Sequence, residues 1–181
     1  MNKILPFLII LLFNLFVSCK HAVPINYPIE PHIEFKNIKT VAGFSDLLGN
    51  PADSLELSLY YTDGDANFGR LSLPDTSVYN CLTIFYKKNN GVFNLVDSDG
   101  LFYNPKYFLI PEIQESNKIY RGRDVTVIAK TLYEGEFQIN ILLVGYHSPF
   151  NIGDTLKATV QITDNDDNKS NIAEMEKIYS Y

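Results

Sequence analysis

The stretch Ser54-Leu55-Glu56-Leu57-Ser58-Leu59-Tyr60-Tyr61 decides the fold, because apolar side chains occupy every second position of it. Side chains alternate between the two faces of a β-strand, so a period of two predicts a strand with one buried face. Residues 156–163 (LKATVQIT) alternate in the same way. Two such strands, in different halves of the chain, predict that it folds mainly as β-sheet.

Shorter segments add further strands. Asn89-Asn90-Gly91 predicts a hairpin, since Asn and Gly tolerate the positive φ of a tight turn, and Glu134-Gly135 is expected to join another two strands. The predicted strands lie at 32–38, 54–62, 81–88, 92–96, 125–131, 137–144, 155–163 and 171–178. They predict an all-β, immunoglobulin-like β-sandwich of seven to eight antiparallel strands, with a closed barrel as the alternative. Residues 97–123 fit none of these strands, and their aromatic side chains are expected to pack on the sandwich.

The first 18 residues have the features of a secretory signal, because Lys3 is followed by an apolar run too short to span a membrane. Phe16-Val17-Ser18-Cys19 then resembles the lipobox of bacterial lipoproteins, in which the cysteine is lipidated and becomes the mature N-terminus. The alternative is an ordinary signal peptide that leaves Cys19 as a thiol. We therefore expect a signal peptide at 1–18, a proline-containing tether at 19–31 beginning with lipidated Cys19, and one β-sandwich domain at 32–181.

The lipobox resemblance also implies a location. Lys20 follows the cysteine, where an aspartate would resemble an inner-membrane retention signal, so the resemblance points to a lipid anchor in the outer membrane. Whether the domain faces the periplasm or the cell surface stays open. The net charge of −6 at pH 7 argues against nucleic acid as a partner.

Residue types that carry catalysis are sparse. His21 and His32 lie in or near the tether, so only His147 is placed to act as a base, and no G-x-S-x-G motif accompanies a serine. Cys81 is the only cysteine after Cys19, which excludes a disulfide within the mature chain and predicts a buried, inert thiol. We expect no enzymatic activity, although paired carboxylates for glycoside hydrolysis stay open as an alternative.

Two acidic loops follow the two most regular strands. They are Thr62-Asp63-Gly64-Asp65-Ala66-Asn67-Phe68-Gly69 and Thr163-Asp164-Asn165-Asp166-Asp167-Asn168-Lys169-Ser170-Asn171. In an immunoglobulin-like sandwich the corresponding loops emerge at the same end, so we expect the carboxylates to crowd together at one pole. Like charges at short distance repel, and a hard cation removes the conflict.

The loops therefore predict a candidate calcium site. Its expected ligands are Asp63, Asp65, Asn67, Asp164, Asp166 and Asp167, all of which offer the oxygen atoms that calcium prefers. The first loop is not an EF-hand, because its sixth position is Phe68 and its twelfth is Pro74. The alternative is that the Asp, Asn and Gly residues only build turns.

The two loops also resemble those of a largely uncharacterised group of Bacteroidetes outer-membrane lipoproteins with immunoglobulin-like or cadherin-like domains. Members of the group pair a D-G-D-x-D-x-G element after an early strand with a D-x-x-G-N-K-S-N element between the last two. Here Asn67 replaces the third Asp, and Asp167 replaces the Gly. The resemblance implies the fold and the location and leaves the task open.

These features favour a membrane-anchored, non-enzymatic binding or adhesion module of the cell envelope with a calcium-ordered pole. Its partner would be another envelope protein or a glycan, bound through some of the 12 tyrosine and 12 phenylalanine rings. We expect Tyr60, Phe102, Tyr103 and Tyr107 to be exposed. Two alternatives stay open: a structural or assembly subunit of an outer-membrane complex, and an accessory protein that binds or processes glycans.

Overall fold

The computed structural model describes residues 26–45, 49, 51–70, 79–98, 102–122, 124–144 and 148–180. Within these ranges the chain is all-β, with ten strands in two antiparallel sheets. The described part of the chain contains no helix that is long and apolar enough to cross a membrane. The predicted signal peptide, Cys19, His21 and His147 lie outside the described residues.

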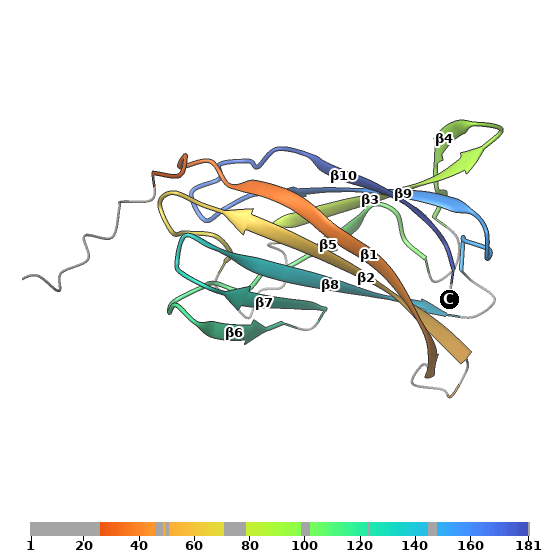
Figure 1. The fold of residues 1–181 in the computed structure, drawn as a ribbon, viewed down its shortest axis with the longest axis horizontal. Helices are drawn as coiled ribbons and strands as arrows, with labels where there is room; N and C mark the ends of the chain where they lie inside the picture. The colour runs from red at the N-terminus through yellow and green to blue at the C-terminus, as the bar shows by residue number, and fades with distance from the viewer. Residues whose placement is uncertain are drawn as a thin grey trace, which may run out of the picture.

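The two sheets pack over one core (Figure 1). The first sheet has the order β1 (His32–Ser45), β2 (Pro51–Thr62), β8 (Glu134–Val144), β7 (Val125–Ala129) and β6 (Lys118–Arg121). The second has the order β10 (Ala173–Ile178), β9 (Thr155–Ile162), β3 (Cys81–Asn89) and β4 (Val92–Leu95), and β5 (Lys106–Phe108) also pairs with β3. The all-β prediction is therefore confirmed.

The alternating stretches lie inside the sheets and supply the core. Leu55, Leu57 and Leu59 of β2 are fully buried, and burial alternates along the whole of β9. The strand predictions for these two stretches are confirmed, as is the hairpin through Asn90 and Gly91. Cys81 is also buried as expected, and burial raises the pKa of its thiol to about 12, which keeps it protonated and unreactive.

One turn prediction is wrong. Glu134 and Gly135 belong to β8, and the turn lies at residues 130–133, where the Thr131 hydroxyl accepts the N–H groups of Tyr133 and Glu134 at 3.1 and 3.0 Å. Gly135 serves close packing instead of a turn. A Cβ there would lie 2.4 Å from the Ile128 carbonyl oxygen, so only glycine fits between the strands.

Residues 97–123 contain two strands that the sequence did not predict, so the expected total of seven to eight is too low. β5 and β6 extend the edges of the two sheets. Phe102 and Phe108 pack into the core as expected of this segment, and the expected exposure of Phe102 is wrong. Tyr103 is exposed as predicted, and so is Tyr107.

One end of the sandwich gathers several chain segments, and we call it the loop pole. It comprises residues 63–70 after β2, 130–133 before β8 and 163–171 between β9 and β10, and the segment 26–31 enters there (Figure 1). Asn171 ties the two sheets together at this end. Its side chain accepts the Ile33 N–H at 2.8 Å and donates to the Ile33 carbonyl oxygen at 2.9 Å, as a neighbouring strand would.

Candidate cation site

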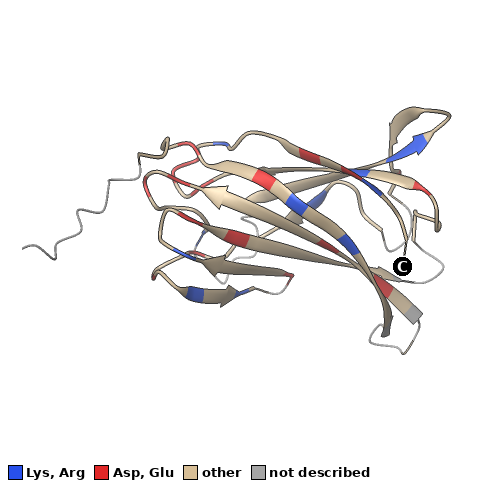
Figure 2. Ribbon diagram, in the orientation of Figure 1, with Lys and Arg blue, Asp and Glu red and all other residues tan. Residues whose placement is uncertain are grey.

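The two acidic loops meet at the loop pole. Asp63 directly follows β2 and Asp164 lies two residues beyond β9, yet carboxylate oxygens of Asp63, Asp65 and Asp164 lie within 4.8 Å of one another. Figure 2 shows acidic residues in the loops at this end. The prediction that the two loops are neighbours is confirmed, and we call these three residues the carboxylate triad.

Asp63 is the most constrained member of the triad. Its side chain is fully buried, and its backbone N–H donates to the Tyr133 carbonyl oxygen at 2.8 Å. Within the described ranges neither carboxylate oxygen of Asp63 has a hydrogen-bond partner, and the buried Oδ1 of Asn67 has none either. Leaving a buried acceptor unpaired costs roughly 1–3 kcal/mol, and more when it is charged.

The pKa of Asp63 reflects this environment. Burial is the largest cause and, with the neighbouring carboxylates of Asp65 and Asp164, raises the pKa from its ordinary value of 3.8 to about 7. The N–H of Phe68 acts in the opposite direction, although it does not reach normal hydrogen-bond geometry. At neutral pH the group therefore stands near the midpoint of its titration, and a cation could take the place of its proton.

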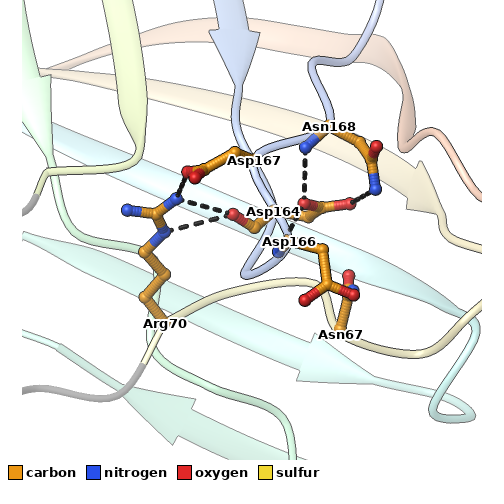
Figure 3. A network of polar contacts seen from close by, with 6 residues as sticks. All are labelled: Asn67, Arg70, Asp164, Asp166, Asp167 and Asn168. Atoms are coloured by element: carbon orange, nitrogen blue, oxygen red, sulfur yellow. Dashed lines mark hydrogen bonds and ion pairs between the residues drawn. The ribbon is translucent and has the colours of Figure 1, made fainter.

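The Asp164 carboxylate, in contrast, is already well bonded (Figure 3). Its Oδ1 accepts the backbone N–H groups of Asp166 and Asn168, both at 2.8 Å. Its Oδ2 accepts the side-chain amide of Asn168 at 2.9 Å. Asp164 thus stabilises the turn of its own loop by hydrogen bonds, and its carboxylate also lies close to those of Asp63 and Asp65.

Three predicted ligands lie around the triad without joining it. The Asn67 amide donates to Asp65 at 3.0 Å and to Asp166 at 2.9 Å, so it links the two loops. Asp166 is therefore connected to the triad through Asn67. Asp167 points the other way and forms an ion pair with Arg70 (Figure 3).

Arg70 is a residue of the site that the sequence analysis did not single out. Its Nε and Nη2 donate to the Asp164 carbonyl oxygen at 3.1 and 3.0 Å, and its guanidinium also pairs with Asp167. The sequence does offer one indication of this role, because Arg70 is a basic residue that directly follows the first acidic loop. Arg70 fastens the second loop through its backbone and neutralises Asp167.

The base of the first loop is apolar. Tyr61 and Phe68 stack in parallel with ring centroids 3.9 Å apart, and both are fully buried. Burial and the nearby Asp63 raise the pKa of Tyr61 above its ordinary value. The stacked rings flank Asp63 in the chain, and all three side chains are shielded from solvent.

The donor set defines which ions the triad could hold. Carboxylate oxygens and the amide oxygen of Asn67 suit hard cations such as calcium or magnesium, and the triad contains no His or Cys ligand for a transition metal. Comparison with known proteins adds nothing to this assignment, since no family model, curated protein or solved structure matches the chain.

Proposed function

We propose that the chain is a membrane-anchored, non-enzymatic binding or adhesion module of the cell envelope, whose loop pole is ordered by calcium. The cation part of the proposal rests on Asp63. Its side chain is fully buried, has no hydrogen-bond partner in the described chain, and lies close to the carboxylates of Asp65 and Asp164. A cation bound there would supply the partner that this carboxylate lacks, which supports the proposal.

Calcium fits this role better than magnesium. Calcium accepts six to eight oxygen ligands in flexible geometry, whereas magnesium demands a regular octahedron. Here the oxygen donors come from two loops of different shape, one of which is already held by its own hydrogen bonds. Asp63, Asp65 and Asp164 would hold the ion, with the Asn67 Oδ1 as a further ligand. The ion would cross-link the loop after β2 to the loop between β9 and β10.

The strand order supports an immunoglobulin-like domain. In such domains strands A, B, E and D form one sheet and strands C, F and G form the other. The orders β1-β2-β8-β7 and β10-β9-β3 correspond to A-B-E-D and G-F-C. In this reading β4, β5 and β6 are additions at the edges, and the carboxylate triad joins the B–C and F–G loops, the end of the fold that carries ligand contacts in antibody variable domains.

The resemblance of residues 16–19 to a lipobox supports the lipid anchor. A Cys19→Ala variant is expected to move from the membrane fraction to the soluble fraction. Exposed rings support the role in binding: Tyr79 and Tyr107 lie with centroids 6.4 Å apart, and Tyr103 is also exposed. Tyrosine rings of this kind are enriched where proteins contact other proteins, and they suit glycans as well.

Thermal unfolding tests the cation. Calcium at about 100 times its Kd adds about 2.7 kcal/mol, which corresponds to a rise in Tm of about 5–10 °C for a domain of this size. The rise should vanish in the Asp63→Ala, Asp164→Ala double variant and persist in Asp167→Asn, whose side chain faces Arg70. An unchanged Tm in the wild-type protein on moving from EDTA to millimolar calcium would remove the ion from the proposal.

A further inference from the structure

The segment that precedes β1 is attached to two parts of the loop pole. The Gly64 N–H donates to the Pro28 carbonyl oxygen at 2.8 Å, and the Tyr27 hydroxyl donates to Glu134 Oε2 at 2.7 Å. Pro31 is buried at the start of β1. The chain is therefore held against the pole from Tyr27 onward, before the first strand begins.

The attachment point on the first loop lies inside the candidate cation site. Gly64 stands between Asp63 and Asp65, two members of the carboxylate triad. A Cβ on Gly64 would lie 2.2 Å from the Tyr27 carbonyl oxygen and 2.4 Å from that of Pro28. Both contacts are with backbone, so the loop and the segment touch without any side chain between them. A movement of the loop at Gly64 must therefore displace the segment.

The loop carries two of the three carboxylates of the triad. Asp63 and Asp65 flank Gly64, and their carboxylates repel each other and that of Asp164 when all are ionised. A cation between them would remove the repulsion and fix the direction of the Gly64 N–H. Without a cation the repulsion is relieved by a proton on the triad or by movement of the loop, and such movement would break the hydrogen bond from Gly64 to Pro28.

We propose that cation binding at the carboxylate triad and docking of residues 27–31 on the loop pole stabilise each other, a coupling that rests on the proposed cation site. Each event then raises the affinity of the other by the same factor. The cation thereby controls how far the domain can extend from its lipid anchor. Release of five residues would lengthen the connection to a lipid at Cys19 by up to about 17 Å, at roughly 3.3 Å per residue.

Amide exchange tests the coupling in the unsubstituted domain. We would use residues 19–181 with Cys19→Ser to omit the lipid, and follow the Gly64 amide by NMR in EDTA and in saturating calcium. The Gly153 amide is a matched reference. It also donates at 2.8 Å, to the Tyr179 carbonyl oxygen, and it lies between the end of β8 and the start of β9, opposite the loop pole. Calcium is expected to slow the exchange of Gly64 about tenfold more than that of Gly153.

A pair of tyrosine variants tests the reciprocal effect. Both Tyr27 and Tyr60 donate to the same Glu134 oxygen, and only Tyr27 belongs to the docked segment. Calcium titrated into Tyr27→Phe by calorimetry should bind about fivefold more weakly than in the wild type. Tyr60→Phe removes the other phenol from the same carboxylate and should change the Kd less than about twofold.

The two readouts separate this coupling from the cation site itself. If calcium produces neither heat nor a Tm shift, the proposed cation site is overturned and the coupling with it. If calcium binds but Gly64 and Gly153 respond alike, or if the two tyrosine variants bind calcium equally well, the cation site stands and the coupling is overturned.

Discussion

Each of the two acidic loops at the loop pole contributes a buried aspartate to the carboxylate triad, but the two aspartates differ in their hydrogen bonds. Asp164 accepts three hydrogen bonds from its own loop, whereas Asp63 is fully buried and accepts none within the described chain. Both aspartates follow a central strand, and they face each other in the carboxylate triad. Turn building therefore accounts for Asp164, whereas Asp63 is the residue on which the proposed ion binding rests.

The backbone explains the difference. The loop between β9 and β10 is closed by pairing of Thr163 with Lys169, so its N–H groups point inward to Asp164. In the loop after β2, by contrast, N–H groups at both ends donate to other segments. The N–H of Gly64 binds Pro28, and that of Arg70 binds Ile110. Neither of these N–H groups reaches Asp63, and the N–H of Phe68, although directed at it, does not reach hydrogen-bond geometry, so the carboxylate has no hydrogen-bond partner within the described chain.

The largest effect is expected from Asp63→Asn, which removes the charge and nearly keeps the shape. In EDTA at pH 8 the variant should be more stable than the wild type by roughly 2–4 kcal/mol, because the wild type must ionise a buried group whose pKa is about 7. Calcium should stabilise only the wild type. Urea denaturation of both proteins, with and without calcium, measures these differences.

The size of this stability difference depends on pH. The folded-state pKa of Asp63 lies above its ordinary value, so the folded state is favoured when Asp63 is protonated. The contribution of Asp63 to stability is therefore complete below about pH 4 and is lost as pH rises to about 7. The advantage of Asp63→Asn should therefore shrink toward pH 4. If Asp63 only built a turn, the asparagine variant would be equal to or less stable than the wild type at every pH.

A second, somewhat smaller effect is expected on calcium affinity. A proton competes with the ion at Asp63, so the Kd should rise as pH falls below 7 and be about 50-fold higher at pH 5 than at pH 7. Calorimetry in buffers with different ionisation heats would measure both the Kd and the proton that is released. A Kd that is unchanged between pH 7 and pH 5 would place the ion away from Asp63.

The parts of this arrangement that follow from local pattern were predictable from the sequence. The period of two along 54–61 and 156–163 placed β2 and β9, and sandwich topology then placed their loops at one pole. The misassigned turn at Gly135 shows the limit of such reasoning. A glycine required by close strand packing carries the same sequence signal as a glycine required by a turn.

The roles within the site depended on contacts that a sequence does not display. Nothing in the order of residues distinguishes Asp63 from Asp164, because the difference arises from where the backbone N–H groups of each loop point. The same holds for Asp167, which pairs with Arg70 instead of facing the triad. The attachment of Tyr27 to Glu134 joins residues far apart in the chain, and no local pattern announces it.

The smallest effects compare Asp164 with Asp167 in one loop. Asp164→Ala removes the acceptor of three hydrogen bonds, two of them from backbone N–H groups, and should cost about 2 kcal/mol of unfolding free energy even in EDTA. Asp167→Asn should cost less than about 0.5 kcal/mol, because this carboxylate is largely exposed and exposed ion pairs contribute little. Denaturant unfolding in EDTA measures both, so neither value depends on an ion. Equal losses in the two variants would mean that the second loop is held by charge with Arg70 and not by the hydrogen bonds of Asp164, and the contrast between the two loops would then disappear.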